Sequence, residues 1–302
     1  MKMQNALLIG NDINSLSPGY DWAQLLRDLV AFVGAQGKIS ELREQFPLLY
    51  EEICIHAGSH GTKTEGQIKQ FIADKVQELK PNDIHLDLLH IGINEVLTTN
   101  YEFILERSIL PSQLETKNRG VVSETRYSIF RNVQAEQIRF WHIHGDAHTP
   151  NSIALGYEHY SGYLQSMRNY VVSGTGDAYK NVQLTPLTQR LSKGSKQELM
   201  SWLDVLFTHD VHIVGLGLDF VEIHLWWLLT FRARLGNGRK WPHQNSLFYY
   251  YPTQREDLDR TKLRFLRANN VLPQACDRPN TDKRAYYKNV IRKIKSNIKS
   301  RS

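Results

Sequence analysis

The sequence predicts an α/β fold, with a parallel sheet that carries helices on both faces and a helical insertion that serves as a lid. Two observations predict it. Four short apolar runs, bounded by Gly, Asn or Asp, lie at residues 6–9, 95–97, 138–143 and 211–216. Helical patterns lie between these runs, and this alternation is typical of parallel strands that are covered on both sides.

The N-terminal elements follow from the apolar periodicity. The run at residues 6–9 begins the sheet, and residues 22–33 place their apolar side chains on one helical stripe, as expected for a helix after the first strand. Residues 38–90 carry apolar residues three and four apart, which predicts further helices. The polar loop at residues 56–66 separates two of these helices, and we expect it to form part of the lid.

The C-terminal elements continue the alternation of strands and helices. Residues 151–196 are aromatic and helix-like, and residues 212–236 have the pattern of a strand, a glycine turn and an amphipathic helix. Residues 246–252 form a late strand that ends at Pro252. Residues 104–137 show no clear pattern.

The composition is that of a globular protein. The chain has 302 residues, of which 41% are hydrophobic and 23% charged, and this length is sufficient to bury a substantial apolar interior. No run approaches the roughly 18 apolar residues that a membrane helix needs. Polar residues follow the short apolar start at once, so a signal peptide is not indicated. We therefore expect a cytoplasmic protein without membrane association.

The basic charge is concentrated at the C-terminus. Residues 282–302 hold eight Lys and Arg against one acid, so this segment accounts for the net charge of +6 and the remainder is close to neutral. Apolar residues at helical spacing predict an amphipathic helix there, which either packs on the core or docks a partner or nucleic acid. We expect one domain at residues 1–281, with helical insertions at about 34–90 and 151–200, and a basic helix at 282–302.

The cysteine and histidine pattern does not indicate a metal. Cys54 and Cys276 are far apart and form no CxxC pair, which excludes a disulfide framework and a thiolate zinc site. The densest histidine cluster, at residues 142–148, has no carboxylate-rich helix near it in the sequence. The two cysteines fit a reducing compartment.

Small or polar residues follow the first two core strands, at the edge where ligands bind in open parallel sheets. Gly10 ends the first strand, and the turn after it offers backbone N–H groups to an anion. A tight structural turn is the alternative explanation. Thr98, Thr99 and Asn100 end the second strand and bring hydroxyl and amide groups to the same edge, unless the threonines only cap a helix.

The third and fourth strands end in similar motifs. His144 lies in WHIHGD, and its side chain exchanges protons near neutral pH, while Gly145 allows a flat group to approach. The motif GLGLD at residues 215–219 predicts a backbone cradle for a ribose or phosphate, with an acid near a hydroxyl. Asp219 and Glu222 are expected in the first turn of the next helix, where the helix dipole alone also explains acids.

In this order and at these spacings, the four motifs resemble the sirtuin-like superfamily, and most strongly the bacterial sirtuin-like domains of anti-phage defence, which consume NAD. The resemblance covers roughly residues 5–235. It implies a Rossmann-like fold with a catalytic pair, Asn100 and His144. The residues expected to bind the dinucleotide are Gly10, Asn11, Asp12, Asn14, Thr98, Thr99, Gly215, Leu216, Gly217 and Asp219.

The chain departs from the sirtuin pattern in three places. Asp12 stands where sirtuins usually have a second glycine. Tyr101 and Glu102 stand where deacetylases commonly have an apolar residue and an aspartate. The four-cysteine zinc module of the deacylases has no counterpart, because the chain has two cysteines. The resemblance therefore favours hydrolysis of NAD itself over deacetylation of a protein.

The resemblance implies an NAD glycohydrolase that releases nicotinamide and ADP-ribose. NAD is the substrate, no metal is expected, Asn100 orients water or a ribose hydroxyl, and His144 is the general base. It also implies a homo-oligomer that is triggered by assembly or by a partner protein of the defence system, such as an ATPase or helicase, an Argonaute-like protein or a nucleotide-sensing protein. Two alternatives stay open: a subunit that binds NAD or ADP-ribose without turnover, and a protein that contacts nucleic acid through its basic tail.

Overall fold

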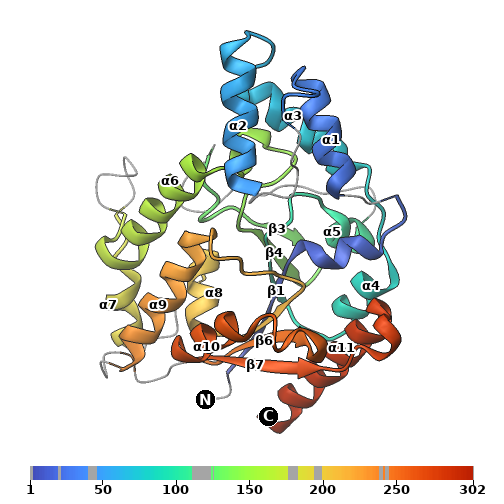
Figure 1. Cartoon of the computed structure of the whole chain (residues 1–302). Helices are drawn as coiled ribbons and strands as arrows, with labels where there is room; N and C mark the ends of the chain where they lie inside the picture. The colour runs from blue at the N-terminus through green and yellow to red at the C-terminus, as the bar shows by residue number, and fades with distance from the viewer. Residues whose placement is uncertain are drawn as a thin grey trace.

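A computed structural model describes residues 3–19, 22–39, 46–110, 124, 126–175, 183–193, 199–237, 241 and 245–301. Within these residues, seven strands form one sheet in the order β3-β4-β2-β1-β5-β6-β7 (Figure 1). Neighbouring strands are parallel except for β3 and β4. The strands are β1 (Asn5–Ile9), β2 (Glu95–Thr98), β3 (Val133–Ala135), β4 (Ile138–His142), β5 (Asp210–Val214), β6 (Leu247–Pro252) and β7 (Val271–Cys276).

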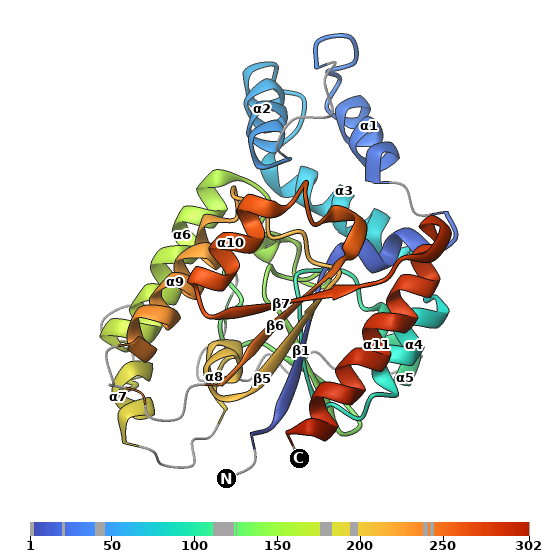
Figure 2. The ribbon, with the colours of Figure 1, turned by 60° about the horizontal axis from the view of Figure 1, so that its bottom comes forward.

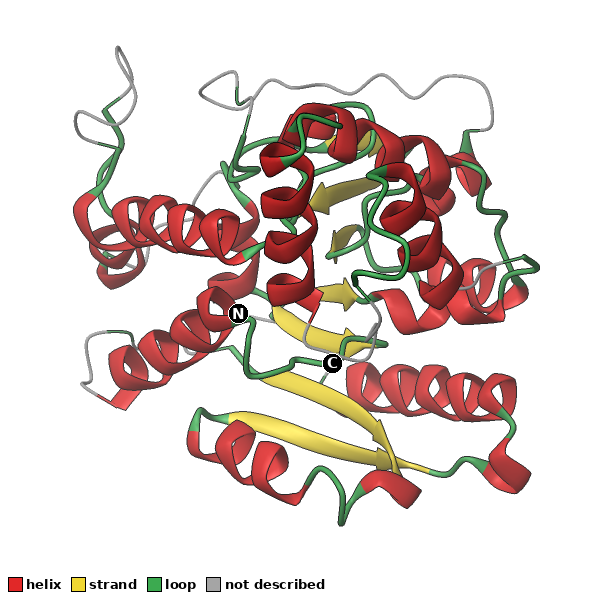
Figure 3. Ribbon diagram, turned by 45° about the horizontal axis from the view of Figure 1, so that its top comes forward, coloured by secondary structure: helices red, strands yellow, loops and turns green. Residues whose placement is uncertain are grey.

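Helices alternate with the strands along the chain and lie on both sides of the sheet (Figure 3). The predicted α/β fold is confirmed. The helices are α1 (Trp22–Phe32), α2 (Phe46–Ser59), α3 (Glu65–Gln77), α4 (Asp83–Leu89), α5 (Ile104–Ile109), α6 (Tyr157–Arg168), α7 (Leu187–Ser192), α8 (Trp202–Thr208), α9 (Ile223–Asn237), α10 (Arg260–Ala268) and α11 (Lys283–Ser300).

Two apolar cores form because successive strand residues point to opposite faces of the sheet. Leu7 and Ile9 of β1 pack with α1 to α4 and α11, whereas Ala6 and Leu8 pack with α6, α8 and α9. Figure 2 shows α4, α5 and α11 on one side of the strands and α6, α9 and α10 on the other. Burial on both faces explains why the strands are apolar runs without a polar alternation.

The order of the six parallel strands is that of a Rossmann fold. If only these strands are numbered, the sheet order is 3-2-1-4-5-6. Successive strands are added toward one edge up to the third strand and toward the other edge from the fourth, so the order reverses between β1 and β5. Ligands bind to such sheets outside the carboxyl ends of the strands at this switch point. The topology therefore selects one edge of the sheet as the place to look for a site.

Helices α1, α2 and α3 rise above that edge as a separate group (Figures 1 and 2). Aromatic contacts hold them together: the rings of Trp22 and Phe46 are 4.9 Å apart, and those of Phe32 and Phe71 stack at 4.5 Å. The predicted loop at residues 56–66 is shorter than expected, because α2 continues to Ser59. Thr64 then starts α3 through a capping box with Gln67. Parts of the two predicted insertions, residues 40–45, 176–182 and 194–198, lie outside the described residues.

Two strands have no counterpart in the sequence prediction. β3 has three residues and pairs antiparallel with β4 at one edge of the sheet. β7 forms the other edge, and Pro273 lies within it. β3 is too short to leave an apolar pattern, and β7 is only partly buried and tolerates a proline because it lies at the edge.

The C-terminal helix α11 packs on the core. Tyr287, Val290, Ile291 and Ile294 are buried in the same apolar cluster as Leu7 of β1. Asp282 caps its N-terminus by accepting the backbone N–H groups of the next turn. Most of the Lys and Arg side chains of α11 are exposed. In the described part of the chain, no helix is long and apolar enough to cross a bilayer.

Candidate functional site

A cavity of about 770 Å³ lies at the carboxyl ends of β1, β2, β4 and β5. This volume falls within the range of about 300–1,000 Å³ that is usual for ligand sites. Polar groups come from the four strand ends, whereas the apolar wall comes from the helical group above them. The apolar residues of that wall are Trp22, Phe46, Pro47, Val76 and Leu79.

The first and fourth motifs lie against each other. A Cβ atom on Gly10 would come within 2.4 Å of the Gly215 carbonyl oxygen and of Leu216 Cα. The Gly10 N–H donates to the Val214 carbonyl (2.9 Å), and the Asp12 N–H donates to the Gly215 carbonyl (3.0 Å). These two N–H groups therefore hold β1 to β5 and are already engaged within the protein. Gly10 is needed for this close approach and lies behind the cavity lining.

The second motif joins β2 to β1 before it reaches the cavity. The Thr98 hydroxyl donates to the Ile9 carbonyl and accepts the Asn100 N–H, both at 3.0 Å. The Thr99 N–H also donates to the Ile9 carbonyl (3.1 Å). The Thr98 hydroxyl is thus engaged within the sheet, and Thr98 does not line the cavity. Thr99 and Asn100 line the cavity.

A buried carboxylate lies beside Asn100. Glu102 Oε1 accepts Nδ2 of Asn14 (2.8 Å) and Nδ2 of Asn100 (3.2 Å). Burial raises the pKa of Glu102 to about 7, and the hydrogen bond from Asn14 opposes this rise. His85 Nε2 lies 3.0 Å from Asn14 Oδ1 and completes the chain of polar contacts. The acid of this motif therefore changes its charge near neutral pH.

Asn100 also presents an unpaired acceptor. Its Oδ1 atom is buried and has no hydrogen-bond partner among the described residues. Buried acceptors are seldom left without a partner. Because Asn100 lines the cavity, Oδ1 marks the position at which a hydroxyl group or a water molecule is expected to donate.

His142 holds the backbone of Asn100. Its Nδ1 atom is 2.7 Å from the Asn100 carbonyl oxygen and its Nε2 atom is 2.8 Å from Glu106 Oε1. Both partners are acceptors, so the ring donates from both nitrogens and is cationic. Burial lowers the pKa of His142, but the Glu106 carboxylate outweighs this effect, and the pKa is raised to about 9. No motif pointed to this role.

The third motif turns sharply after His144. Gly145 has a φ of +87°, and a Cβ atom there would lie 2.1 Å from the Ser152 carbonyl oxygen. The glycine therefore accommodates the returning chain, which corrects the expectation that it admits a flat ligand. The Ala154 N–H donates to the His144 carbonyl (2.8 Å) and fixes the position of the turn.

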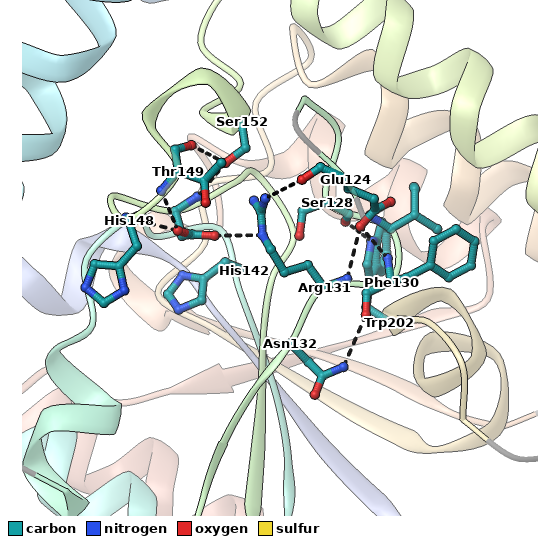
Figure 4. Close-up of polar contacts among 12 residues, drawn as sticks. Glu124, Ser128, Phe130, Arg131, Asn132, His142, His148, Thr149, Ser152 and Trp202 are labelled. Atoms are coloured by element: carbon teal, nitrogen blue, oxygen red, sulfur yellow. Dashed lines mark hydrogen bonds and ion pairs between the residues drawn. The ribbon is translucent and has the colours of Figure 1, made fainter. Parts of the chain in front are cut away.

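A buried ion pair anchors the same turn. Arg131 Nε lies 2.8 Å from Asp146 Oδ2, and both side chains are 2% exposed. Figure 4 shows Arg131 between Glu124 and the segment from His148 to Ser152. Removing one partner of such a pair leaves an uncompensated charge, so the pair restricts where the turn can lie.

His144 points into the cavity as a neutral ring. It is 3% exposed, and burial lowers its pKa to about 3. Its Nε2 atom lies 2.7 Å from Nε2 of His224, in the first turn of α9. Because Nε2 is engaged, Nδ1 is the atom through which His144 can contact a ligand.

Two further acids come from the segment between β5 and α9. Asp219 and Glu222 line the cavity, but both precede α9, which starts at Ile223, so they do not occupy its first turn as predicted. Glu222 Oε2 accepts the Asp219 N–H (3.0 Å). Burial and the charge of Asp219 raise the pKa of Glu222 to about 7.

Asp12 is neutralised by the C-terminal helix. Lys283 Nζ lies 2.6 Å from Asp12 Oδ1 and donates to the Ser15 hydroxyl at 2.7 Å. The Tyr287 hydroxyl donates to Asp12 Oδ2. Asp12 lines the cavity, so α11 sets the charge at this part of its rim.

Ten of the twelve predicted site residues line this one cavity, and Gly10 and Thr98 lie behind it. The ten are Asn11, Asp12, Asn14, Thr99, Asn100, His144, Gly215, Leu216, Gly217 and Asp219. Sequence reasoning missed the contributions of Trp22, Phe46 and Tyr160, whose apolar spacing resembles that of core residues. It also missed His224, although this residue follows the GLGLD motif closely.

Within the described ranges, no group of three or more His, Cys, Asp and Glu side chains is placed to hold a metal ion. Cys54 and Cys276 are both free thiols.

Comparison with curated proteins finds no match. The family model for the SIR2-like domain matches residues 94–273, which is more than half of the chain. The matched segment runs from β2 to β7 and includes Asn100, His144 and the 215–219 turn. Strand order, cavity and motif positions agree with this match, and the chain belongs to the SIR2-like domain family.

Proposed function

We propose that this protein hydrolyses NAD to nicotinamide and ADP-ribose. The observation that carries the proposal is that neighbouring strands β2 and β4 bring Asn100 and His144 to one cavity at the switch point of the sheet. The proposal is also supported by membership of the SIR2-like family, whose members act on NAD. The shared cavity and the family membership both support the proposal that Asn100 and His144 act on a dinucleotide.

The reaction breaks the bond between ribose C1′ and the nicotinamide nitrogen. Nicotinamide leaves as a neutral molecule, water adds to C1′, and one proton is released. The leaving group is already cationic in NAD, so the protein needs no strong acid; it must position water and stabilise a positively charged, oxocarbenium-like transition state.

Three polar side chains of the cavity have roles in this scheme. Asn100 Oδ1 accepts a hydrogen bond from the attacking water or from a ribose hydroxyl. His144 is neutral and accepts a second hydrogen bond through Nδ1. Glu102, in its ionised form, stabilises the positive charge that develops on the ribose.

Release of nicotinamide from NAD tests the proposal directly. We expect Asn100→Ala and His144→Ala to lower the rate by roughly 100-fold or more, with thermal stability and NAD binding retained. His90→Ala, at an exposed position after α4, is the control and should keep full activity. Turnover that survives both cavity substitutions would contradict the assignment of the site.

A second candidate is a subunit that binds NAD or ADP-ribose without turnover. The low pKa of His144 favours it, because such a ring is a weak base. Calorimetry with NAD, alongside the nicotinamide assay, separates the two candidates. Binding without release in every assembly state would support the second.

We also propose that the enzyme serves bacterial anti-phage defence and acts only after a partner protein or self-assembly triggers it, because free turnover would deplete cellular NAD. A surface that suits such contact lies at the mouth of the cavity. Phe220 lines the cavity, is 53% exposed, and lies 5.9 Å from the ring of Phe265. Phe220→Ser should weaken activation by a partner while leaving the fold intact, which unfolding curves can check.

A further inference from the structure

The two histidines His144 and His224 form an isolated buried pair. Their Nε2 atoms are 2.7 Å apart, and His224 is fully buried in α9. The rings of Tyr160 and Tyr163, both in α6, flank His224 at 4.5 Å and 5.6 Å. Burial depresses the pKa of both histidines, and none of the causes is a carboxylate. Both rings are therefore neutral.

Neutral imidazoles constrain each other when they share one hydrogen bond. Of the two facing nitrogens, one must carry the proton and the other must accept it. The tautomer of His144 thus determines that of His224, and the reverse. Nδ1 of His224 is buried and has no partner among the described residues, so this ring has no other hydrogen bond that could orient it.

The charge of the substrate distinguishes the two arrangements. If His144 donates from Nε2, its Nδ1 lone pair faces the cavity, where it can accept from water or a ribose hydroxyl. If His224 donates instead, an N–H of His144 points toward the cationic nicotinamide and the developing oxocarbenium ion. A lone pair near a positive charge is favourable and an N–H dipole there is not.

We propose that His224 is the positioning residue for His144: it accepts the Nε2–H of His144, fixes the ring, and leaves the Nδ1 lone pair facing the substrate. The inference rests on the proposed hydrolysis of NAD, in which His144 touches the substrate. In many hydrolases a third group orients the base in this way, usually a carboxylate. Here a neutral ring takes that place, so His144 gains orientation without a raised pKa.

Kinetics of two His224 variants test this role. His224→Leu removes the acceptor, and we expect kcat for nicotinamide release to fall by about 10- to 100-fold with KM nearly unchanged. His224→Gln restores an acceptor oxygen and should recover most of kcat. His209→Leu is the matched control, because His209 is also buried and has one ring nitrogen without a partner, but its other nitrogen contacts Thr208 instead of His144. Equal kcat in wild type and His224→Leu would overturn the proposal.

Nitrogen-15 NMR of histidine-labelled protein gives a readout that needs no turnover. With NAD or ADP-ribose bound, His144 should be in the Nε2–H tautomer in the wild type and in His224→Gln, and in a mixture of tautomers in His224→Leu. A protonated Nδ1 on His144 in the wild type would contradict the proposed direction of the hydrogen bond. If the wild type releases no nicotinamide, the hydrolase assignment fails, while the NMR result still decides whether His224 sets the tautomer.

Discussion

Glu102 lines the cavity and contacts Asn100, and its charge changes near neutral pH. Burial raises its pKa to about 7, because the desolvated carboxylate is only partly compensated by the amide donors of Asn14 and Asn100. If the carboxylate stabilises the developing positive charge, only its ionised form is active. The pH dependence of the reaction is therefore set at this residue.

We expect kcat of the wild type to rise as pH passes through about 7, in step with ionisation of Glu102. Glu102→Gln should lower kcat by roughly tenfold or more and remove this inflection. Glu222→Gln is the comparison, since Glu222 also lines the cavity and its pKa is also raised to about 7, but it follows β5 instead of β2. If only Glu222→Gln removes the inflection, the titrating group is Glu222, and the assignment to Glu102 is wrong.

His142 gives a second pH effect, on stability. Its pKa in the folded state is raised to about 9, so its contribution is complete below its unfolded pKa of about 6.5 and is lost as pH rises through about 9. His142→Gln should lower the free energy of unfolding by about 3 kcal/mol at mildly acidic pH. Urea unfolding at several pH values should show this difference narrowing between about pH 6.5 and pH 9 and disappearing at higher pH. A difference that does not depend on pH would mean that His142 is neutral.

At the scale of elements, the cavity combines parts of the family domain with parts outside it. The SIR2-like match begins at residue 94, whereas the apolar wall comes from α1 to α3 and the charge at Asp12 is balanced by α11. A sheet with the same strand order could therefore keep its polar groups and still bind a different ligand, according to which helices cover it.

The contact of α11 with Asp12 predicts an effect on binding. Lys283→Met leaves the Asp12 carboxylate without its cation, and the anionic diphosphate of NAD is then repelled. Because both side chains are partly exposed, we expect NAD affinity, measured by calorimetry, to fall only about three- to tenfold. Lys288→Met is the control, as Lys288 pairs with Asp83, which does not line the cavity. An equal loss in both variants would indicate a general effect of charge.

At the scale of the whole molecule, the two halves of the sheet meet where β1 lies beside β5. Gly10 allows this contact, because any side chain there would overlap the backbone at Gly215 and Leu216. The two glycine motifs are far apart in the sequence, yet they form one packed junction below the cavity. Overall stability and the shape of the site therefore depend on the same contact.

Gly10→Ala should destabilise the whole protein by about 1–3 kcal/mol, since the backbone of β5 must move to admit the methyl group. Gly58→Ala, in α2, is the matched control: its Cβ would meet no atom within 4 Å, and alanine favours the helix by roughly 0.5–1 kcal/mol. Denaturant unfolding measures both. Similar stability of the two variants would contradict the claim that a side chain at position 10 overlaps the backbone at Gly215 and Leu216.

The sequence by itself determined the class of fold and the edge at which the site lies. Short apolar runs that are buried on both faces identify parallel strands, and the polar residues directly after Leu97 and Ile143 and the glycine after Val214 identify their carboxyl ends. Local pattern was sufficient for both, since strand burial and chain direction are expressed residue by residue. The positions of Asn100 and His144 on one cavity follow from these two facts.

The tertiary structure alone decided what each neighbouring residue does. Gly10 and Gly145 face backbone instead of ligand, at Gly215 and at Ser152 respectively, and neither approach is encoded in the motif that contains the glycine. His142 and His224 act through partners on other elements, at distances that no spacing encodes. The pKa values of Glu102 and His144 likewise depend on burial by the assembled fold. Contacts and desolvation arise only when the chain is folded, so the chemistry of the site could not be obtained from motifs alone.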